Sequence, residues 1–298
     1  MVEAETSAQG ADGVGRAILL VLLANLLFAF VDTSTKWLIG AGLAVLPLAF
    51  MRYAVHFGLT IADRTIRARP AYRLRRGVTW LVLFRSICIV SATLANFVAL
   101  GHLSLSVTAS ILYLSPVFIC LFARPMLGEI VTAKHWSAIL LGLIGALVIL
   151  WPVGEPINWY AVLMLYPAIA LALYQVLTRQ LAHEVRPSTL QFYTGAVGTV
   201  VLLPFALVSW TTPVSPLDWT LFLAIGAFAW AGHEALIRAH SYTEASTLAP
   251  FGYIFINYLT GAEILVFGEL PELRVFAGAA LIFAGGMLAW RVDRRLAS

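Results

Sequence analysis

The sequence predicts an all-α membrane protein of ten transmembrane helices, built as two inverted repeats of five helices around a central cavity. Three observations support this fold class. Of the 298 residues, 61% are hydrophobic and only 11% are charged, whereas soluble domains carry about 25% charged residues. The apolar residues fall into runs of about 20, the length that crosses a hydrocarbon core roughly 30 Å thick. The second half of the chain also repeats the first at an offset of about 140 residues.

Ten apolar runs have spanning length, and their number and flanking charges predict the topology. An even number of spans places both termini on one side. With cytoplasmic termini, fifteen Lys and Arg residues lie in cytoplasmic segments and only Lys36 and Arg274 in external ones. Cytoplasmic loops are enriched in Lys and Arg, so we expect cytoplasmic termini and a multi-pass protein of the bacterial inner membrane. The expected spans are 16–38, 43–62, 78–100, 104–125, 134–151, 158–180, 189–210, 218–239, 245–267 and 273–290.

The repeat predicts two domains, residues 16–151 and 158–290. Each half contains five spans, an odd number, so the second half enters the membrane from the side opposite to the first. Inverted repeats of this kind are typical of transporters, with a substrate site near the midplane where the halves meet. When the first helices of the two repeats are aligned, Lys36 is opposite Arg179. The later matching pairs are Ala99 with Ala239, Ser106 with Ser246, Ala109 with Ala249, Tyr113 with Tyr253, Gly128-Glu129 with Gly268-Glu269, and Gly145 with Gly285.

Polar and aromatic side chains near the middle of the spans are candidates for substrate contact. Polar groups in lipid are costly, so they face a cavity or one another. One interpretation is a pocket whose amides and hydroxyls bind a polar solute while its rings pack on the apolar part. The other is hydrogen bonding between helices within an aromatic core. The candidates are Asn25, Tyr113, Trp230, Tyr253 and Asn257.

Buried charged residues are candidates for ion pairing, substrate binding or proton transfer. Arg52 and Arg85 lie within spans, and Arg52 needs a partner such as Asp32, Glu263 or a substrate carboxylate. Asp32 precedes Lys36 by one helical turn, which favours a local pair of these two. Burial shifts the pKa of carboxylates and histidines within spans, so these residues can carry protons. The possible proton carriers are His56, His233, Glu234 and Glu263.

Proline and glycine mark places where the helices can bend or end. Pro116 and Pro250 lie within spans and remove backbone donors, which predicts either hinges for alternating access or static kinks. The repeated Gly-Glu pairs, Gly128-Glu129 and Gly268-Glu269, stand between spans. Glycine permits a tight helix exit and glutamate favours the positive end of a helix, so we expect a structural role for these pairs.

The ordered motifs Ala99, Ser106, Ala109, in-helix Pro116, Gly128-Glu129 and a Gly-rich final span, with their second copy, resemble the EamA-type drug/metabolite transporter superfamily. The resemblance covers essentially the whole chain. It implies a basket of helices whose cavity is formed by spans one, three, four, six, eight and nine, with five and ten outside. It also implies metabolite export, and the aromatic midplane is most similar to the YddG-type amino acid exporters.

We therefore expect an exporter of aromatic and other neutral amino acids that works by alternating access, with efflux of other small metabolites or cationic drugs as the alternative. The histidines at His233 and His240 are seven apart, whereas a zinc-protease helix needs a spacing of four, so an enzyme is not expected. No cofactor, metal or nucleic-acid partner is expected. The expected partners are a small-molecule amino acid and membrane lipid. The sequence leaves the oligomeric state open, and a monomer is one of the states it allows.

Overall fold

The computed structural model describes residues 2–67, 74, 76–112, 114–129, 132–150, 159–182, 184–248, 251–252, 254–268 and 270, with short pieces between 273 and 285. No strand occurs among these residues. The helices formed there are α1 (Val2–Gly40), α2 (Val45–Ile66), α3 (Arg76–Leu100), α4 (Leu105–Leu112), α5 (Ser115–Leu127), α6 (Ala133–Leu150), α7 (Trp159–Leu163), α8 (Leu165–Leu181), α9 (Pro187–Val208), α10 (Pro216–Tyr242), α11 (Ala245–Leu248) and α12 (Ile254–Phe267).

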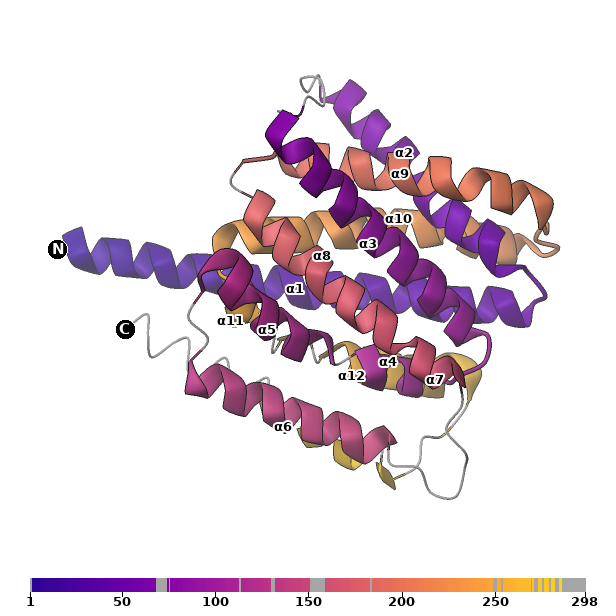
Figure 1. Ribbon diagram of the computed structural model, residues 1–298. Coiled ribbons are helices and arrows are strands. Elements are labelled where there is room, and N and C mark those ends of the chain that lie inside the picture. Colours follow the sequence, from indigo (N-terminus) through magenta and orange to yellow (C-terminus); the bar gives the residue numbers. More distant parts are fainter. Residues whose placement is uncertain are drawn as a thin grey trace.

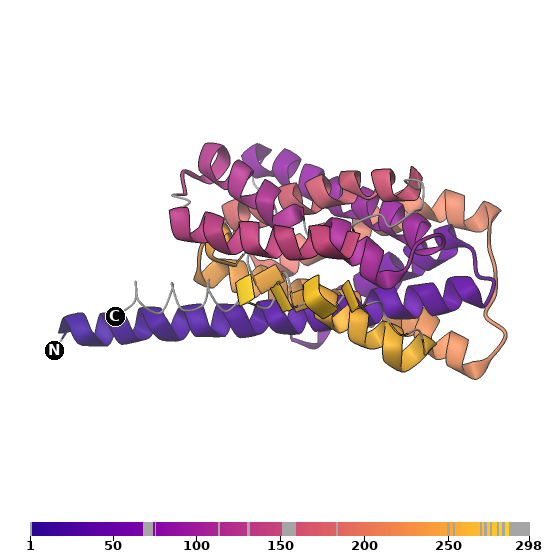
Figure 2. The ribbon, with the colours of Figure 1, turned by 90° about the horizontal axis from the view of Figure 1, so that it is seen from below.

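The long helices form one bundle in which the two halves of the chain are interleaved (Figure 1). Each of the first three helices packs against a partner from the second half: α1 lies along α10, α2 along α9, and α3 along α8. Seen from below, α12 lies along α1 (Figure 2). Any cavity inside this bundle is consequently bounded by residues of both halves.

Seven helical stretches among the described residues are long and apolar enough to cross a membrane. They coincide with predicted spans one to four and six to eight. The fifth prediction falls in α6, the ninth is divided between α11 and α12, and half of the tenth lies outside the described residues. The seven stretches are Gly13–Gly40, Val45–Ile66, Gly77–Leu100, Leu105–Leu127, Trp159–Leu181, Pro187–Val208 and Pro216–Tyr242.

Two of these spans are interrupted, each close to a buried proline. The fourth span is divided between α4, which ends at Leu112, and α5, which begins at Ser115, and Pro116 occupies the first turn of α5. The sixth is divided between α7 and α8, with Pro167 in the first turn of α8. Proline suits a first turn because it has no N–H to leave unpaired there. The prediction of a bend at Pro116 is consistent with this geometry, and its role as a hinge stays a prediction.

Glycine ends the two helices that precede the Gly-Glu pairs. Gly128 has φ = 71° and Gly268 has φ = 68°, in the left-handed region. A side chain is strained in this conformation. The prediction that glycine permits the exit of these helices is confirmed.

Glycine also lets α2 lie close to α9 and α10. A Cβ atom added at Gly226 would lie 2.4 Å from the Cβ of Val55 and 3.0 Å from the carbonyl oxygen of Met51. Overpacking of this kind costs about 1–3 kcal/mol. We expect Gly226→Ala to lower the thermal unfolding midpoint in detergent. Gly58→Ala, on the exposed side of α2 with nothing within 4 Å of the added atom, should not lower it, and equal losses in both variants would contradict close packing at Gly226.

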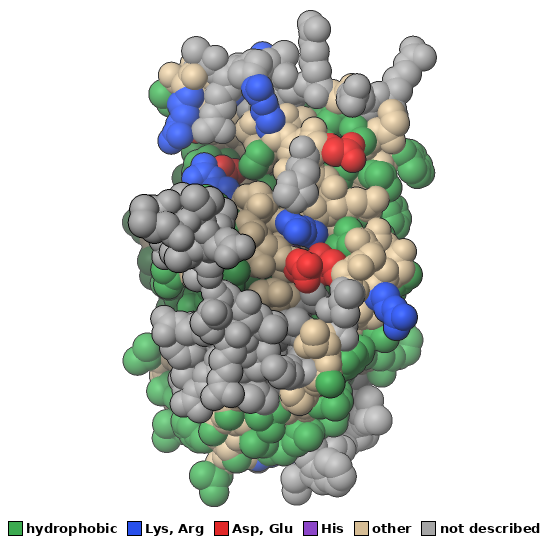
Figure 3. All heavy atoms as spheres, turned by 90° about the vertical axis from the view of Figure 1, so that its left-hand side faces the viewer, with side chains coloured by type: hydrophobic (Ala, Val, Ile, Leu, Met, Phe, Trp, Pro, Cys, Tyr) green, Lys and Arg blue, Asp and Glu red, His purple; other side chains and the backbone are tan. Residues whose placement is uncertain are grey.

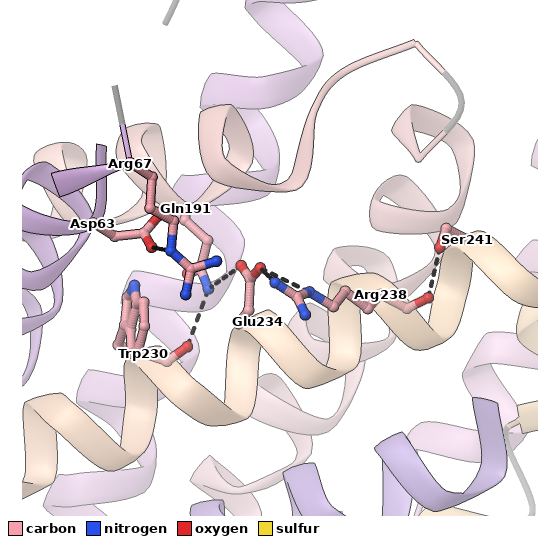
Figure 4. A network of polar contacts seen from close by, with 7 residues as sticks. All are labelled: Asp63, Arg67, Gln191, Trp230, Glu234, Arg238 and Ser241. Carbon is pink, nitrogen blue, oxygen red and sulfur yellow. Dashed lines mark hydrogen bonds and ion pairs between the residues drawn. The ribbon is translucent and has the colours of Figure 1, made fainter. Parts of the chain in front are cut away.

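Charged side chains gather at the end of the bundle where α1 begins (Figure 3). Two ion pairs lie there, Arg67 with Asp63 at 2.9 Å and Arg238 with Glu234 at 2.6 Å. Gln191 donates to the carbonyl oxygen of Trp230 and to Glu234, which joins α9 to α10 (Figure 4). Because these pairs are partly exposed, each contributes at most about 1 kcal/mol to stability. Because Arg67 and Arg238 are exposed, we call this end of the bundle the hydrated end.

At the opposite end of the bundle, α1 contacts the start of α10. Ser215 and Asp218 form a capping box at the first turn of α10. The other carboxylate oxygen of Asp218 accepts a hydrogen bond of 3.0 Å from the indole N–H of Trp37 on α1. This contact joins the first half of the chain to the second.

Candidate functional site

A cavity of about 130 Å³ lies inside the bundle, between the two halves. A water molecule needs roughly 10–15 Å³ of such a cavity volume, so this cavity can hold about ten waters. Its walls come from α1, α3, α5, α8 and α10, with fewer residues from α4, α11 and α12 and with Arg52 from α2. These helices correspond to spans one, three, four, six, eight and nine, the set that the family resemblance implies, with Arg52 as the addition.

One wall of the cavity carries hydrogen-bond acceptors. The Asp32 carboxylate is 6% exposed and accepts a 3.1 Å hydrogen bond from the side-chain amide of Asn96. A carboxylate only accepts, so the amide nitrogen of Asn96 faces it and the amide oxygen is left over. That oxygen is buried without a partner, and both residues line the cavity. This pair of side chains is suited to a ligand that donates hydrogen bonds, such as an ammonium group.

Arg52 places a positive charge on the cavity wall. It is 5% exposed, donates a 2.7 Å hydrogen bond to Thr93 and contacts His233 Nε2 at 3.2 Å. Its Nε has no hydrogen-bond partner, and no acidic side chain of the described chain forms an ion pair with it. Asp32 lines the same cavity and is near enough to interact with the charge of Arg52, but it is not bonded to it. A buried charge without a bonded counter-ion is costly unless a ligand or water completes its surroundings. Ser115, whose hydroxyl is also buried without a partner, lines the same cavity.

The predicted local pair of Asp32 with Lys36 is wrong. Lys36 instead lies 3.7 Å from Glu263, while Asp32 is bonded to Asn96. Asp32 faces the cavity from α1, whereas Glu263 approaches Lys36 from α12, a contact between distant segments that helical spacing does not reveal. Asp32 is therefore left facing the cavity without a cation bonded to it.

Sequence reasoning placed Arg85 within a span but gave it no partner and no role, and the structure shows it fully buried. It donates three hydrogen bonds to neutral hydroxyls, at 2.7 Å to Thr178, 2.9 Å to Thr194 and 2.9 Å to Tyr174. Its guanidinium also lies 4.3 Å from the centre of the Tyr174 ring. The signal was its position within a span, the same signal that singled out Arg52. The hydroxyl partners come from α8 and α9, and their convergence is visible only in the fold.

The predicted substrate residues are divided among several places. Asn25 lines the cavity and donates a 3.0 Å hydrogen bond to the Val21 carbonyl. Trp230 and Asn257 are partly buried and are not among the lining residues. Tyr113 and Tyr253, together with the predicted hinge Pro250, lie outside the described residues, whereas Pro116 lines the cavity.

The predicted proton carriers also lie in different parts of the structure. His56 is fully buried beside His233, with ring centroids 5.7 Å apart, and does not line the cavity. His233 does line it. Glu234 pairs with Arg238 at the hydrated end. Glu263 lies away from the cavity lining, in a contact between the two halves.

That contact, which we call the α4 clasp, is built from Glu263, Lys36, Leu105 and Ser106. The Leu105 amide at the start of α4 donates to Glu263 at 3.1 Å, and the Ser106 hydroxyl donates to the other carboxylate oxygen. Lys36 adds its charge at 3.7 Å. The cation, the amide and the hydroxyl belong to the first half of the chain and the carboxylate to the second.

A second contact, the α11 clasp, is built the other way round from Glu129, Arg179 and Ala245. The Ala245 amide at the start of α11 donates to Glu129 at 3.2 Å, and Arg179 Nε lies 3.6 Å from the same oxygen. Here the carboxylate comes from the first half. Arg179 is the residue opposite Lys36 in the repeat, and Ala245 follows Leu105 by 140 residues. The two clasps lie toward opposite ends of the bundle, where α4 and α11 begin (Figure 1).

Comparison with known families decides what this architecture belongs to. The family model of the EamA-like transporter family matches the chain twice, at residues 15–151 and 158–291. The chain is a member of the EamA-like transporter family. The family prediction made from the motifs is thereby confirmed, and so is the assignment to multi-pass membrane transporters of small molecules.

Individual relatives of this EamA-family protein cover most of its length. It is 30% identical over 266 residues to the pseudopaline exporter CntI of Pseudomonas aeruginosa, covering 89% of this chain and 92% of that protein. It is 27% identical to a riboflavin transporter of Vibrio cholerae, with 89% of each covered. It is also 27% identical to an S-adenosylmethionine uptake transporter of Rickettsia conorii, with 84% of each covered. The solutes differ, so these relatives do not single out the amino acid subgroup.

The fold of the transporter is also found in a solved crystal structure. The two superpose with a TM-score of 0.74, covering 98% of this chain and 99% of the other, at 20% sequence identity. At this identity the similarity concerns the fold alone.

Proposed function

We propose that this transporter exports a small zwitterionic metabolite of the amino acid class across the bacterial inner membrane. One observation carries the proposal: the cavity between the two halves presents Arg52, which has no ion-pair partner among the described residues, and an acceptor pair, Asp32 with Asn96. A solute with a carboxylate and an ammonium group satisfies both. A solute with only one of these groups leaves one of the two charged side chains without a bonded partner.

The remaining lining suits the side chain of such a solute. Three phenylalanines, Phe28, Phe97 and Phe255, line the same cavity. Apolar and aromatic walls with a few placed polar groups are typical of small-molecule sites. This combination supports aromatic and other neutral amino acids. The contacts predicted for Tyr113 and Tyr253 remain part of the proposal.

Export by alternating access is supported by the paired clasps. In an inverted-repeat transporter the two halves rock about the substrate site, opening one end while the other stays closed. Each clasp joins the halves at one end of the bundle only. The carboxylate comes from the second half in the α4 clasp and from the first half in the α11 clasp. We assign residues 16–151 and 158–290 as the two repeats. The end with Arg67 and Arg238 is assigned to the cytoplasm, because Lys and Arg favour that side.

The test is competition for counterflow in liposomes among three matched probes: phenylalanine, phenethylamine and 3-phenylpropionate. Labelled phenylalanine is expected to exchange, and it should be displaced by unlabelled phenylalanine far better than by the amine or the acid. Absence of exchange for phenylalanine and for the other neutral amino acids would overturn the proposal. Displacement by the amine at least as strong as by phenylalanine would favour efflux of cationic solutes.

Asp32→Asn separates the two ends of the solute. The variant removes the negative charge while keeping the side-chain shape, so the ammonium group loses its counter-charge. We expect the apparent affinity for phenylalanine to fall about tenfold or more, since hydrogen bonds to charged groups contribute about 1.5–3 kcal/mol. Inhibition by 3-phenylpropionate should not weaken, because this probe has no ammonium group. A parallel loss for the acid would show that Asp32 supports the fold of the site and not the ammonium group.

A further inference from the structure

A continuous chain of polar side chains runs from buried Arg85 to the cavity. Arg85 donates to the Tyr174 hydroxyl at 2.9 Å, that hydroxyl lies 2.8 Å from His233 Nδ1, and His233 Nε2 lies 3.2 Å from Arg52 Nη2. Four helices contribute one member each, α3, α8, α10 and α2. Only the last two members, His233 and Arg52, line the cavity.

The hydrogen-bond chemistry of the chain fixes where the His233 proton lies. A guanidinium nitrogen can only donate, so His233 Nε2 must accept from Arg52 through its lone pair. The neutral ring therefore carries its proton on Nδ1 and donates it to the Tyr174 oxygen. That oxygen accepts from Arg85 as well, which uses both of its lone pairs. With the other tautomer, two donors would face each other between His233 and Arg52.

These hydrogen bonds determine how Arg52 is held on the cavity wall. Its Nη1 donates to Thr93 and its Nη2 to His233, so both terminal nitrogens are bound to the protein. Nε has no partner. Two anchors on a planar group fix its orientation and reduce the freedom that ligand binding must otherwise remove.

We propose that Arg85, Tyr174 and His233 are positioning residues that hold Arg52 ready for the solute carboxylate and so set the preference of the site for carboxylates. This inference rests on the proposed function for its ligand. The placement of the His233 proton does not depend on any ligand, which allows the two to be tested separately.

The first test is the tautomer of His233 in the purified transporter, read from nitrogen-15 shifts of labelled histidine. The His233 signal is assigned as the one that His233→Gln removes. We expect neutral imidazole with its proton on Nδ1, and a larger share of the Nε2–H form in Tyr174→Phe, where the acceptor for Nδ1–H is gone. A wild-type His233 that carries its proton on Nε2, or that is doubly protonated at neutral pH, would overturn the proposal.

The second test measures carboxylate preference. In Tyr174→Phe we expect the apparent affinity for 3-phenylpropionate to fall about tenfold, on the scale of one hydrogen bond to a charged group, with an unchanged maximal rate of phenylalanine exchange. Affinity for phenethylamine should stay constant, a pattern that a general loss of structure does not produce. His233→Gln, whose amide oxygen can still accept from Arg52, should retain more acid affinity than His233→Leu. Tyr193→Phe, a partly buried tyrosine of α9 away from the cavity, serves as the matched control.

The outcomes separate the two proposals. If none of the three probes binds the wild type, the proposed function fails, and the tautomer still decides whether His233 holds Arg52. If the probes bind but Tyr174→Phe changes neither the tautomer nor the affinity for the acid, the positioning role alone is overturned.

Discussion

Arg52→Gln is expected to abolish exchange of phenylalanine and of other zwitterionic solutes in liposomes. Arg52 is buried on the cavity wall, and within the described chain no carboxylate is paired with it. A solute carboxylate that enters the variant cavity would lose its hydration without gaining a cation. Removing one partner of a buried charge pair costs about 2–5 kcal/mol or more, so the apparent affinity should fall by roughly thirtyfold at the least.

Arg52→Lys refines this result. Lysine keeps the charge but lacks the planar fork that bonds Thr93 and His233 at the same time, so partial activity is expected. Arg238→Gln is the matched control, because Arg238 is half exposed and paired with Glu234 at the hydrated end. Normal exchange by Arg52→Gln, or an equal loss in Arg238→Gln, would contradict a specific role for Arg52 in binding the solute.

The sequence predicted the helical membrane fold because length and composition decide it locally. A run such as Pro187–Val208 has no charged residue and is mostly apolar over 22 residues, and a helix satisfies the backbone of such a run in lipid. The same reasoning identified Arg52 as a residue that needs a partner, since the cost of a buried charge does not depend on the neighbouring helices. Asp32 and Asn25 were also found among the polar residues of a span.

The partners of these residues could not be predicted, because they come from distant segments. Asp32 was assigned to Lys36 from helical spacing, yet the fold brings Asn96 to Asp32 and Glu263 to Lys36. Trp230 was placed in the pocket by its depth along the span. Depth does not give the rotation of a helix, and Trp230 does not line the cavity, while His233, three residues later, does. Helical phase relative to neighbours is a tertiary property that a single sequence does not contain.

Glu263→Gln and Glu129→Gln are expected to shift the transporter toward opposite conformations. Glu263 joins the halves only at the α4 end of the bundle and Glu129 only at the α11 end. Each substitution removes the charge that Lys36 or Arg179 faces and weakens one end selectively. Alternating access requires opening of one end to accompany closure of the other, so each variant should populate the state open at its own end.

Accessibility of a cysteine placed in the cavity at Asn25 measures this shift. The two native cysteines, Cys88 and Cys120, are buried and should first be replaced by serine. In sealed vesicles of either orientation, a membrane-impermeant thiol reagent should label Asn25→Cys faster from the α4 end in Glu263→Gln and faster from the α11 end in Glu129→Gln. Glu234→Gln, which breaks a partly exposed pair within one helix, should alter neither rate. Changes in the same direction for both clasp variants would mean that the clasps stabilise the bundle as a whole, because gates at opposite ends must respond in opposite senses.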